Sequence, residues 1–373
     1  MTAPRPSVPA PTASAPGPGR RYELDALRIV AAVSVVLYHY TFSGPAGGLS
    51  DLSFPRIGRV TRYGYLGVDA FFMVSGFVVL LSAWNRTPRR FLASRASRLY
   101  PAYWAAVTLT ATVCVVLGAG RFPVSGIQYL ANLTMFNAPL GVENVDVVYW
   151  TLWAELRFYG VVLALILVGL TRRRVTGALW LWLGAACVTA SGVLPAPLSR
   201  LLEVPVQSSW AHYFVAGMAL CLVTKYGPTR STVLLVLGSY ALALHHATGF
   251  AATVADRYDE PLSPAVVTLA VTLVFLVMTG IATGWTRRLG RGWFVHAGAL
   301  TYPLYLLHAH TGFILFNLFA GTVEPHVLLT AVITAMCAAA YALHRLVERP
   351  LTGVLLDRLQ GSPGRRKARH SRG

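Results

Sequence analysis

Ten apolar runs follow one another along this chain, and each comes close to the roughly 20 residues that an α-helix needs to cross a bilayer. The runs are 24–43, 64–84, 99–119, 146–170, 175–194, 209–224, 231–249, 262–284, 296–319 and 326–344. The run at 209–224 is the shortest and the weakest, and the segments between runs are short. The pattern therefore predicts an all-α, polytopic integral membrane protein with about ten transmembrane helices and no separate soluble domain.

The composition agrees with a bilayer as the solvent for much of the chain. Charged residues make up 12% of the 373 residues, whereas soluble domains contain about 25%. The mean hydropathy is +0.55, and a buried core grows too slowly with chain length to hold this much apolar sequence. These values exclude an ordinary cytosolic enzyme and a disordered chain. The four cysteines lie inside apolar runs without CxxC or Cys/His ligand spacing, so neither a metal site nor a disulfide framework is predicted.

The charges of the chain are strongly unbalanced, with 32 basic and 14 acidic residues and a formal net charge of +18. Such an excess is typical of nucleic-acid binding or of cytoplasmic loops that follow the positive-inside rule. With the N-terminus placed in the cytoplasm, 24 basic residues fall on the cytoplasmic side and six on the outer side. This distribution favours a multi-pass protein of the cell membrane with both termini cytoplasmic. It predicts membrane lipid, and no nucleic acid, as a partner.

The two ends of the chain differ in composition from its middle. Residues 1–21 are rich in Pro, Ala, Ser and Gly, and they are predicted to form a disordered N-terminal tail. No clear cleavage pattern follows the first apolar run, so we expect no cleaved signal peptide. The predicted membrane domain covers residues 22–350, and residues 351–373 are predicted to form a basic cytoplasmic tail.

The first predicted span carries three ionisable residues, Asp25, Arg28 and His39. Arg28 and His39 are eleven residues apart, so they share one helix face and are separated by about 16 Å along the axis. Asp25 lies one turn before Arg28, where the two side chains form a simple ion pair near the inner interface or take part in a site. His39 lies well inside the span, where an imidazole can accept a proton near neutral pH. We therefore interpret His39 as a functional residue.

The second and fourth spans also contain polar groups that are costly in a membrane. Asp69 is a candidate buried carboxylate, and the Ser75–Gly76 pair either allows close helix packing or opens space for a ligand. Glu155 lies in an aromatic-rich stretch and needs a partner, because a lone buried carboxylate is strongly destabilising. The predicted partner lies on another helix or in a site.

A cluster of arginines precedes the third span in the segment RTPRRFLASRASRLYPAYW. Arg95 and Arg98 are three residues apart, on one side of a helical turn. They either mark the cytoplasmic side or bind phosphates through their paired donors. The aromatic residues that follow are predicted to form an interfacial belt. They include Tyr100, Tyr103 and Trp104.

Together these segments resemble the membrane acyltransferase family 3, which includes O-acyltransferases of sugars, polysaccharides and macrolides. The resemblance runs from about residue 24 to residue 350, with Arg28 and His39 at the positions of the family's Arg–His pattern and Thr151 in place of a Ser. Many relatives carry an added extracytoplasmic hydrolase domain of the SGNH type. No segment of this sequence is long enough for such a domain, so we expect a stand-alone acyltransferase here. The matching segments are LDALR, FFMVSGF, RASRLYPAYW, WTLWAELRFY, YPLYLLH and HRLVERP.

The resemblance implies transfer of an acyl group from cytoplasmic acyl-CoA to a hydroxyl of a carbohydrate-like or macrolide-type acceptor, without a metal. His39 would be the general base, and Arg28 would stabilise the oxyanion or bind a CoA phosphate. Glu155 would orient an imidazole or bind an acceptor hydroxyl, and Asp25 completes the implied catalytic set. Direct transfer and an acyl-histidine intermediate both stay open.

The implied ligand-binding residues fall into two groups. The donor group is Arg95 and Arg98, which lie on the side where CoA would enter. The implied substrate-binding residues are Asp69, Ser75, Tyr103, Trp150, Tyr159 and His308.

Two other classes of protein fit the same residues. A multi-pass transporter or exporter of a lipid-linked or glycosylated metabolite also has many helices and polar membrane residues, and it would move its substrate unmodified. A structural subunit of a membrane assembly would tolerate the loss of His39. The acyltransferase interpretation accounts for the polar residues as a set.

Overall fold

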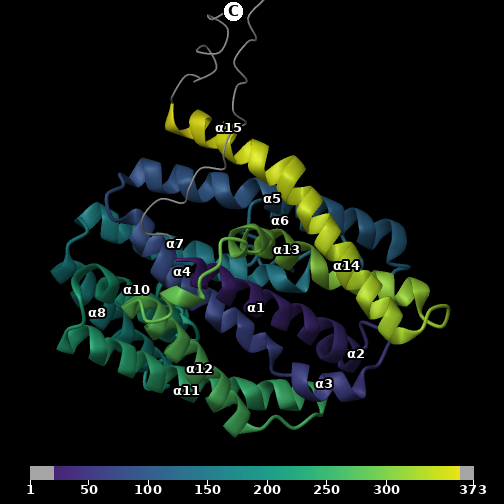
Figure 1. Ribbon diagram of the computed structural model, residues 1–373, viewed down its shortest axis with the longest axis horizontal. Helices are drawn as coiled ribbons and strands as arrows, with labels where there is room; N and C mark the ends of the chain where they lie inside the picture. The colour runs from purple at the N-terminus through teal and green to yellow at the C-terminus, as the bar shows by residue number, and fades with distance from the viewer. Residues whose placement is uncertain (1–20, 362–373) are drawn as a thin grey trace, which may run out of the picture.

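The computed structural model describes residues 21–361, and this part of the chain is helical without a strand. The helices pack as one bundle (Figure 1). The predicted disordered tail lies outside the described residues, except for Arg21. The basic end of the chain beyond residue 361 also lies outside them.

Each of the ten predicted runs overlaps one long helix of the bundle. The long helices are α1 (Tyr22–Tyr38), α4 (Gly67–Ala83), α5 (Pro88–Leu117), α7 (Trp150–Val168), α8 (Arg172–Ala190), α10 (Ala211–Tyr226), α11 (Arg230–Tyr258), α12 (Pro264–Thr283), α13 (Phe294–Phe319) and α14 (Pro325–Leu343). The predicted all-α, multi-helix membrane fold is therefore confirmed.

Shorter helices connect the long ones. They are α2 (Gly44–Ala46), α3 (Pro55–Thr61), α6 (Gly126–Leu133), α9 (Ala196–Val206) and α15 (Arg349–Gln360). Single 3₁₀ or π turns complete the connections. They are η1 (His39–Ser43), η2 (Gly64–Leu66), η3 (Val147–Tyr149), η4 (Arg287–Leu289) and η5 (His344–Glu348).

Eight helical segments of the described chain are long and apolar enough to cross a membrane. The two long helices outside this set are α8, which begins with three arginines, and α13, which carries several histidines. These polar residues dilute the apolar character of both helices. Large side chains on the outside of the bundle, such as Val115, Leu181 and Leu276, are exposed, as expected for helices that face lipid. The number of ten spans is therefore approximate.

Two glycines let α4 and α10 approach each other closely. A Cβ atom on Gly76 would overlap the backbone of Phe214, and one on Gly217 would overlap the backbone of Met73. Small residues at such positions let helix backbones touch in membrane bundles. For Gly76, the packing interpretation of the Ser75–Gly76 pair is confirmed.

The C-terminal boundary of the predicted domain needs a correction. Helix α15 continues from the π turn η5 through Gln360, so the predicted start of a tail at residue 351 falls inside a helix. The helix lies against α5, and the Arg89 Nε–H donates a hydrogen bond to the Leu359 carbonyl oxygen at 3.2 Å. The apolar residues of this segment, such as Leu356, pack on the bundle and continue the helical pattern.

The end of α1 changes its winding at the position of His39. The helix is α-helical to Tyr38, and η1 is a π turn that begins at His39. Single π turns inside helices often accompany functional sites, because the extra residue re-aims the side chains around it.

Candidate active site

Two pockets lie within the bundle. The larger pocket, which we call the arginine pocket, has a volume of about 680 Å³. Its charged lining residues are the basic Arg28, Arg86, Arg95 and Arg98 and the acidic Asp25, Glu155 and Glu348. The smaller pocket, which we call the histidine pocket, has a volume of about 140 Å³ and is lined by His39. Val68 and Tyr305 line both pockets, so the two cavities are neighbours.

Ion pairing in the arginine pocket is incomplete among the described residues. Arg28 Nη1 lies 3.2 Å from Asp25 Oδ1, which confirms the expected ion pair. Arg95 is buried, its guanidinium lies 5.9 Å from the Tyr159 ring centroid, and its Nε has no hydrogen-bond partner among residues 21–361. Burial and the neighbouring Arg95 lower the pKa of Arg86. Four guanidinium groups with three carboxylates leave the pocket with an excess of positive charge, which favours an anionic ligand.

Glu155 belongs to the arginine pocket and has two side-chain partners there. Its Oε1 accepts a hydrogen bond from Ser75 Oγ at 3.0 Å and another from the Tyr159 hydroxyl at 2.6 Å. The expected partner on another helix is therefore Ser75 of α4. Neither of these bonds goes to an imidazole, so the structure does not support the expectation that Glu155 orients a histidine ring.

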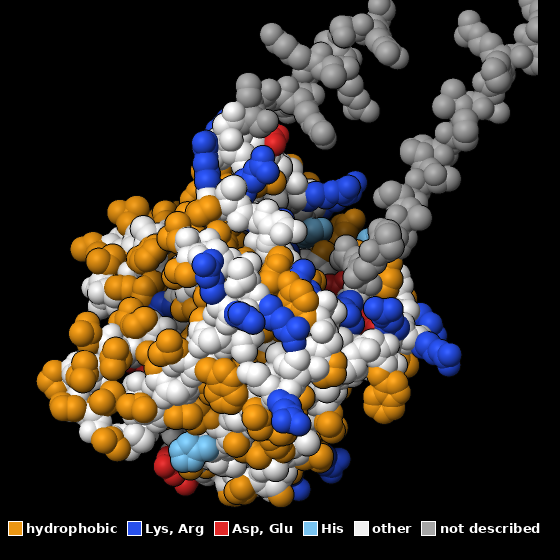
Figure 2. All heavy atoms as spheres, turned by 90° about the vertical axis from the view of Figure 1, so that its left-hand side faces the viewer, with side chains coloured by type: hydrophobic (Ala, Val, Ile, Leu, Met, Phe, Trp, Pro, Cys, Tyr) orange, Lys and Arg blue, Asp and Glu red, His pale blue; other side chains and the backbone are white. Residues whose placement is uncertain are grey.

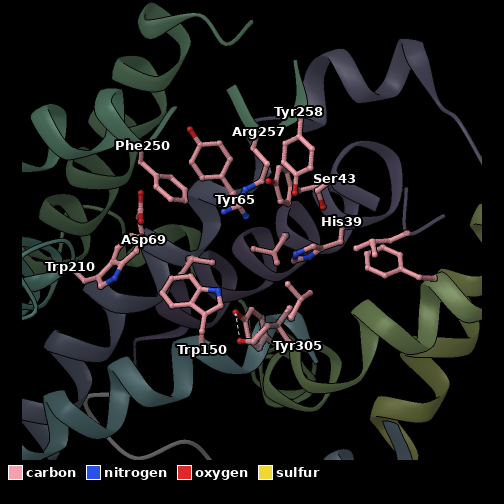
Figure 3. A pocket seen from close by; sticks show the side chains of 17 residues that line it. His39, Ser43, Tyr65, Asp69, Trp150, Trp210, Phe250, Arg257, Tyr258 and Tyr305 are labelled. Atoms are coloured by element: carbon pink, nitrogen blue, oxygen red, sulfur yellow. Dashed lines mark hydrogen bonds between the residues drawn. The ribbon is translucent and has the colours of Figure 1, made fainter. Parts of the chain in front are cut away.

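The histidine pocket has mostly aromatic walls. Figure 3 shows the labelled side chains of this pocket, which come from α1, α4, α7, α11 and α13 and from the loops between them. The aromatic side chains include Tyr65, Trp150, Trp210, Phe250, Tyr258 and Tyr305. The acidic and basic residues of the lining are Asp69 and Arg257. The Asp69 carboxylate accepts a hydrogen bond from the Tyr213 hydroxyl at 2.8 Å.

A second histidine stands directly behind His39. His39 Nδ1 lies 2.9 Å from His308 Nε2. His308 Nδ1 lies 2.9 Å from the Tyr305 carbonyl oxygen and 3.2 Å from the Leu304 carbonyl oxygen. The Tyr40 hydroxyl donates to the His308 carbonyl oxygen at 2.7 Å and holds the backbone of the same turn.

These contacts assign the proton positions of the two neutral rings. A carbonyl oxygen only accepts, so His308 Nδ1 must carry a hydrogen, and His308 Nε2 is then an acceptor. His39 therefore donates from Nδ1 to His308, and the lone pair of His39 is on Nε2. This is the arrangement of a general base whose tautomer is set by a partner behind it.

The structure divides the predicted catalytic set between the two pockets. His39 lines the histidine pocket, whereas Arg28, Asp25 and Glu155 line the arginine pocket. The wide separation of Arg28 and His39 along α1 is consistent with a ligand-binding role for Arg28 at a distance from the base. Arg95 and Arg98, predicted as the donor-binding pair, line the same pocket as Arg28.

The predicted substrate-binding residues have four different placements. Asp69 and Trp150 line the histidine pocket, and Ser75 lines the arginine pocket. Tyr159 contacts Glu155, and His308 contacts His39. Tyr103, Tyr159 and His308 line neither of the two pockets.

Tyr103 and its neighbours hold a loop of the protein. The Tyr103 hydroxyl donates to the Asn132 carbonyl oxygen at 2.8 Å, and the Trp104 indole donates to the Leu133 carbonyl oxygen at 2.8 Å. The Tyr100 hydroxyl donates to the Thr134 carbonyl oxygen at 3.0 Å. These contacts do not test the predicted interfacial belt or the predicted substrate-binding role of Tyr103, so both stay predictions. The polar groups of these three side chains donate to backbone carbonyl oxygens at the end of α6. Backbone groups inside a membrane protein need such partners.

The structure brings further residues, which the sequence patterns did not single out, to the pockets or against α13. Arg86 belongs to the predicted basic loop, and Tyr305 belongs to the YPLYLLH segment, so both had a signal in the sequence. Asp146 is buried and accepts a hydrogen bond from the His310 backbone N–H at 3.0 Å. Arg257 is one of the six basic residues that the charge distribution assigns to the outer side, and no motif surrounds it in the sequence.

A helical membrane bundle with a histidine pair beside an aromatic pocket and with an arginine-lined pocket next to it is an arrangement suited to a membrane-embedded group-transfer enzyme. The family model of acyltransferase family 3, described as an acyltransferase domain, matches residues 21–345. The chain belongs to this family, and it is an acyltransferase of groups other than aminoacyl groups.

The chain is also similar to individual curated proteins. It is 30% identical over 316 residues to the exopolysaccharide production protein ExoZ of Rhizobium meliloti (strain 1021), which covers 79% of this chain and 92% of ExoZ. It is 29% identical over 171 residues to the putative membrane-bound transacylase BcsY of Komagataeibacter xylinus, covering 42% of this chain and 40% of BcsY. It is 27% identical over 154 residues to the O-acetyltransferase OatA of Staphylococcus aureus, covering 36% of this chain and 23% of OatA. No solved structure matches the chain.

Proposed function

We propose that this protein transfers an acyl group from acyl-CoA, bound in the arginine pocket, to a hydroxyl of a polysaccharide or other carbohydrate acceptor in the histidine pocket. One observation carries this proposal: Val68 and Tyr305 line both pockets, so a donor and an acceptor bound on the two sides meet at one place. The family membership supports transfer chemistry over transport of an unmodified substrate.

The donor assignment rests on charge. CoA carries several phosphate groups, and guanidinium forks bind phosphates through paired, charge-assisted hydrogen bonds. Arg28, Arg86, Arg95 and Arg98 meet at one pocket, and the unpartnered Nε of the buried Arg95 favours an incoming acceptor of hydrogen bonds. We infer that the phosphates bind here and that the thioester end extends towards Tyr305.

The acceptor assignment rests on the walls of the histidine pocket. Aromatic side chains such as Trp150 and Trp210, whose ring centroids are 5.1 Å apart, offer flat apolar faces beside polar groups. Binding pockets of this make-up combine apolar walls with a few placed polar groups that orient the ligand. The name of ExoZ, an exopolysaccharide production protein, supports a polysaccharide acceptor.

The chemistry follows from the assigned tautomer. His39 Nε2 takes the proton of the acceptor hydroxyl while the hydroxyl oxygen attacks the thioester carbonyl carbon. A C–O bond forms, the C–S bond breaks, and the leaving CoA thiolate takes up a proton, so that CoA is released as the thiol. His308 Nε2 accepts the hydrogen bond from His39 Nδ1 throughout, and this contact stabilises the imidazolium that forms. His308 is therefore a positioning residue.

The orientation in the membrane follows from the charges. The end of the bundle at which α1 begins carries the arginine pocket, and Lys and Arg side chains are spread over the face on that side (Figure 2). By the positive-inside rule this face is cytoplasmic. We therefore place the donor on the cytoplasmic side and the acceptor on the opposite side.

The proposal is tested with purified protein in detergent or liposomes, labelled acyl-CoA and an oligosaccharide acceptor. The expected product is an acceptor whose mass has increased by one acyl group. Arg95→Ala and Arg98→Ala should each raise the apparent KM for acyl-CoA by about 10-fold, because each loses charge-assisted hydrogen bonds to phosphate. Arg200→Gln, on the exposed surface of α9 away from both pockets, is the control. Passage of unmodified acceptor without a mass change would contradict the proposal.

A further inference from the structure

Arg257 is a cation in the wall of the histidine pocket. It lies in the last turn of α11 and lines the same cavity as His39. Figure 3 shows its side chain extending towards the middle of the cavity, between the labelled side chains of Tyr65 and Tyr258. A cation near the C-terminus of a helix is favourable by itself, but that effect does not require the side chain to point into a pocket.

The guanidinium of Arg257 has no hydrogen bond or ion pair with any group among residues 21–361, and it lines the histidine pocket, unlike Arg56, Arg59 and Arg200, which also have none there. Arg62 lies 3.2 Å from Glu260 and donates to the Pro261 carbonyl oxygen at 2.8 Å. Arg121 binds both carboxylate oxygens of Asp51, at 2.8 and 2.9 Å.

The acidic residue in the pocket does not neutralise this charge directly. Asp69 lines the same cavity, but its carboxylate accepts from the Tyr213 hydroxyl and forms no ion pair with Arg257 in the structure. Arg257 is exposed in the structure, and an anionic ligand seated against the aromatic walls would displace water from its guanidinium and strengthen their electrostatic interaction. A neutral ligand would cover the charge without pairing it, which costs free energy.

From these observations we propose that Arg257 recognises an anionic group on the acceptor, a carboxylate or a phosphate, next to the hydroxyl that is acylated at His39. The cavity of about 140 Å³ is small beside ligand pockets of about 300–1,000 Å³. The anion and the reacting hydroxyl therefore belong to the same sugar unit or to adjacent ones. This inference rests on the proposed function and narrows its acceptor to acidic glycans.

The test compares three oligosaccharides of equal length: a neutral one, one that contains a uronic acid, and one that carries a sugar phosphate. The wild-type protein should acylate at least one acidic acceptor with a higher kcat/KM than the neutral one, and added salt should reduce the difference. The carboxylate and phosphate arms identify which anion is bound. Equal or better use of the neutral acceptor by the wild type would overturn the inference.

Variants separate recognition from folding. Arg257→Gln should lower kcat/KM for the preferred acidic acceptor by about 10- to 100-fold, the range for a lost charge-assisted hydrogen bond. The loss of kcat/KM for the neutral acceptor should be smaller, so the ratio between acidic and neutral acceptors should fall, while the apparent KM for acyl-CoA stays near the wild-type value. Arg257→Lys, which keeps the charge but loses the fork, should retain part of the preference. Arg200→Gln is the matched control, with a similar change of outer charge outside the pocket.

The outcomes of this test distinguish the two levels of the proposal. If the wild type transfers no acyl group to any of the three acceptors, the proposed function fails. If it transfers acyl groups and Arg257→Gln leaves the ratio between acidic and neutral acceptors unchanged, the function stands. In that case Arg257 is an ordinary residue of the outer interface.

Discussion

At the scale of single residues, the pair His39 and His308 decides the chemistry of the site. His39 lies where α1 becomes a π turn, and His308 contacts it from α13, so the proposed base is held by two helices. The carbonyl oxygens behind His308 fix the proton on its Nδ1 and, through it, the tautomer of His39. Two predictions belong to this scale.

The first prediction concerns the base. His39→Ala should reduce acyl transfer by about 10²–10⁴-fold, the usual contribution of a general base, while the protein inserts at near-normal levels. His39→Gln should fail as well, because an amide hydrogen-bonds but does not accept the proton. The measurement is acylated product per unit of membrane protein. If His39→Gln kept most of the activity, the residue would be a hydrogen-bonding or packing group and not the base.

The second prediction concerns the residue behind the base. His308→Gln offers a side-chain oxygen that can accept from His39 Nδ1–H, whereas His308→Leu leaves that hydrogen without a partner. The Gln variant should therefore keep a larger kcat than the Leu variant, with the KM for acyl-CoA near the wild-type value in both. The pH dependence of kcat should shift to lower pH in the Leu variant, because the imidazolium of His39 loses the acceptor that stabilises it, so His39 stays neutral and able to act as a base down to a lower pH. Equal kcat values and identical pH profiles for the two variants would mean that His308 only fills space.

At the scale of secondary-structure elements, the site depends on how closely α4 and α10 pack. Asp69, Ser75 and Val68 all lie on α4, so the position of this helix sets parts of both pockets. Gly76 permits the contact, because its Cα faces the backbone of Phe214 with no room for a side chain. A change at this contact should act on stability and on both pockets together.

The third prediction tests this contact. Gly76→Ala should destabilise the folded protein by about 1–3 kcal/mol, as for other overpacked positions, and lower the midpoint of thermal unfolding in detergent. Gly184→Ala on α8 is the matched control, because a Cβ there meets nothing within 4 Å, and Ala is the better helix former. An equal effect of the two substitutions would show that the close approach of α4 and α10 does not limit stability.

At the scale of the whole molecule, the bundle separates a basic face from the opposite face. Of the 32 basic residues, 24 are assigned to one side and six to the other. This separation also places the arginine pocket at the basic end and the histidine pocket further along α1. A topology follows that can be checked directly.

The fourth prediction is that topology. Reporter fusions after Arg174 and at the C-terminus should report the cytoplasm, and a fusion near Asp256 should report the outside, as the positive-inside rule requires. Each reporter is carried by the full chain, and the two internal positions lie in the first turn of α8 and the last turn of α11. An external C-terminus would contradict the proposed orientation and would place an odd number of spans in the membrane.

The sequence by itself determined the helical membrane fold, because apolar runs of membrane length have few alternatives in a bilayer. It also pointed to Arg28 and His39, because ionisable groups in apolar runs are rare enough to stand out, and to Arg95 and Arg98 through their spacing in the basic segment before the third span. These properties are local, and each is readable within a few turns of one helix.

Only the tertiary structure decided how these residues are shared between two pockets. His39 and His308 are 269 residues apart in the chain, and the partner of Glu155 is Ser75, 80 residues away. The apolar pattern of a transmembrane helix sets where it crosses the membrane, but it leaves the rotation and the neighbours of that helix open. The packing of α1, α4, α7 and α13 resolves that freedom, because backbone contacts at small residues and buried polar pairs are satisfied together in one arrangement.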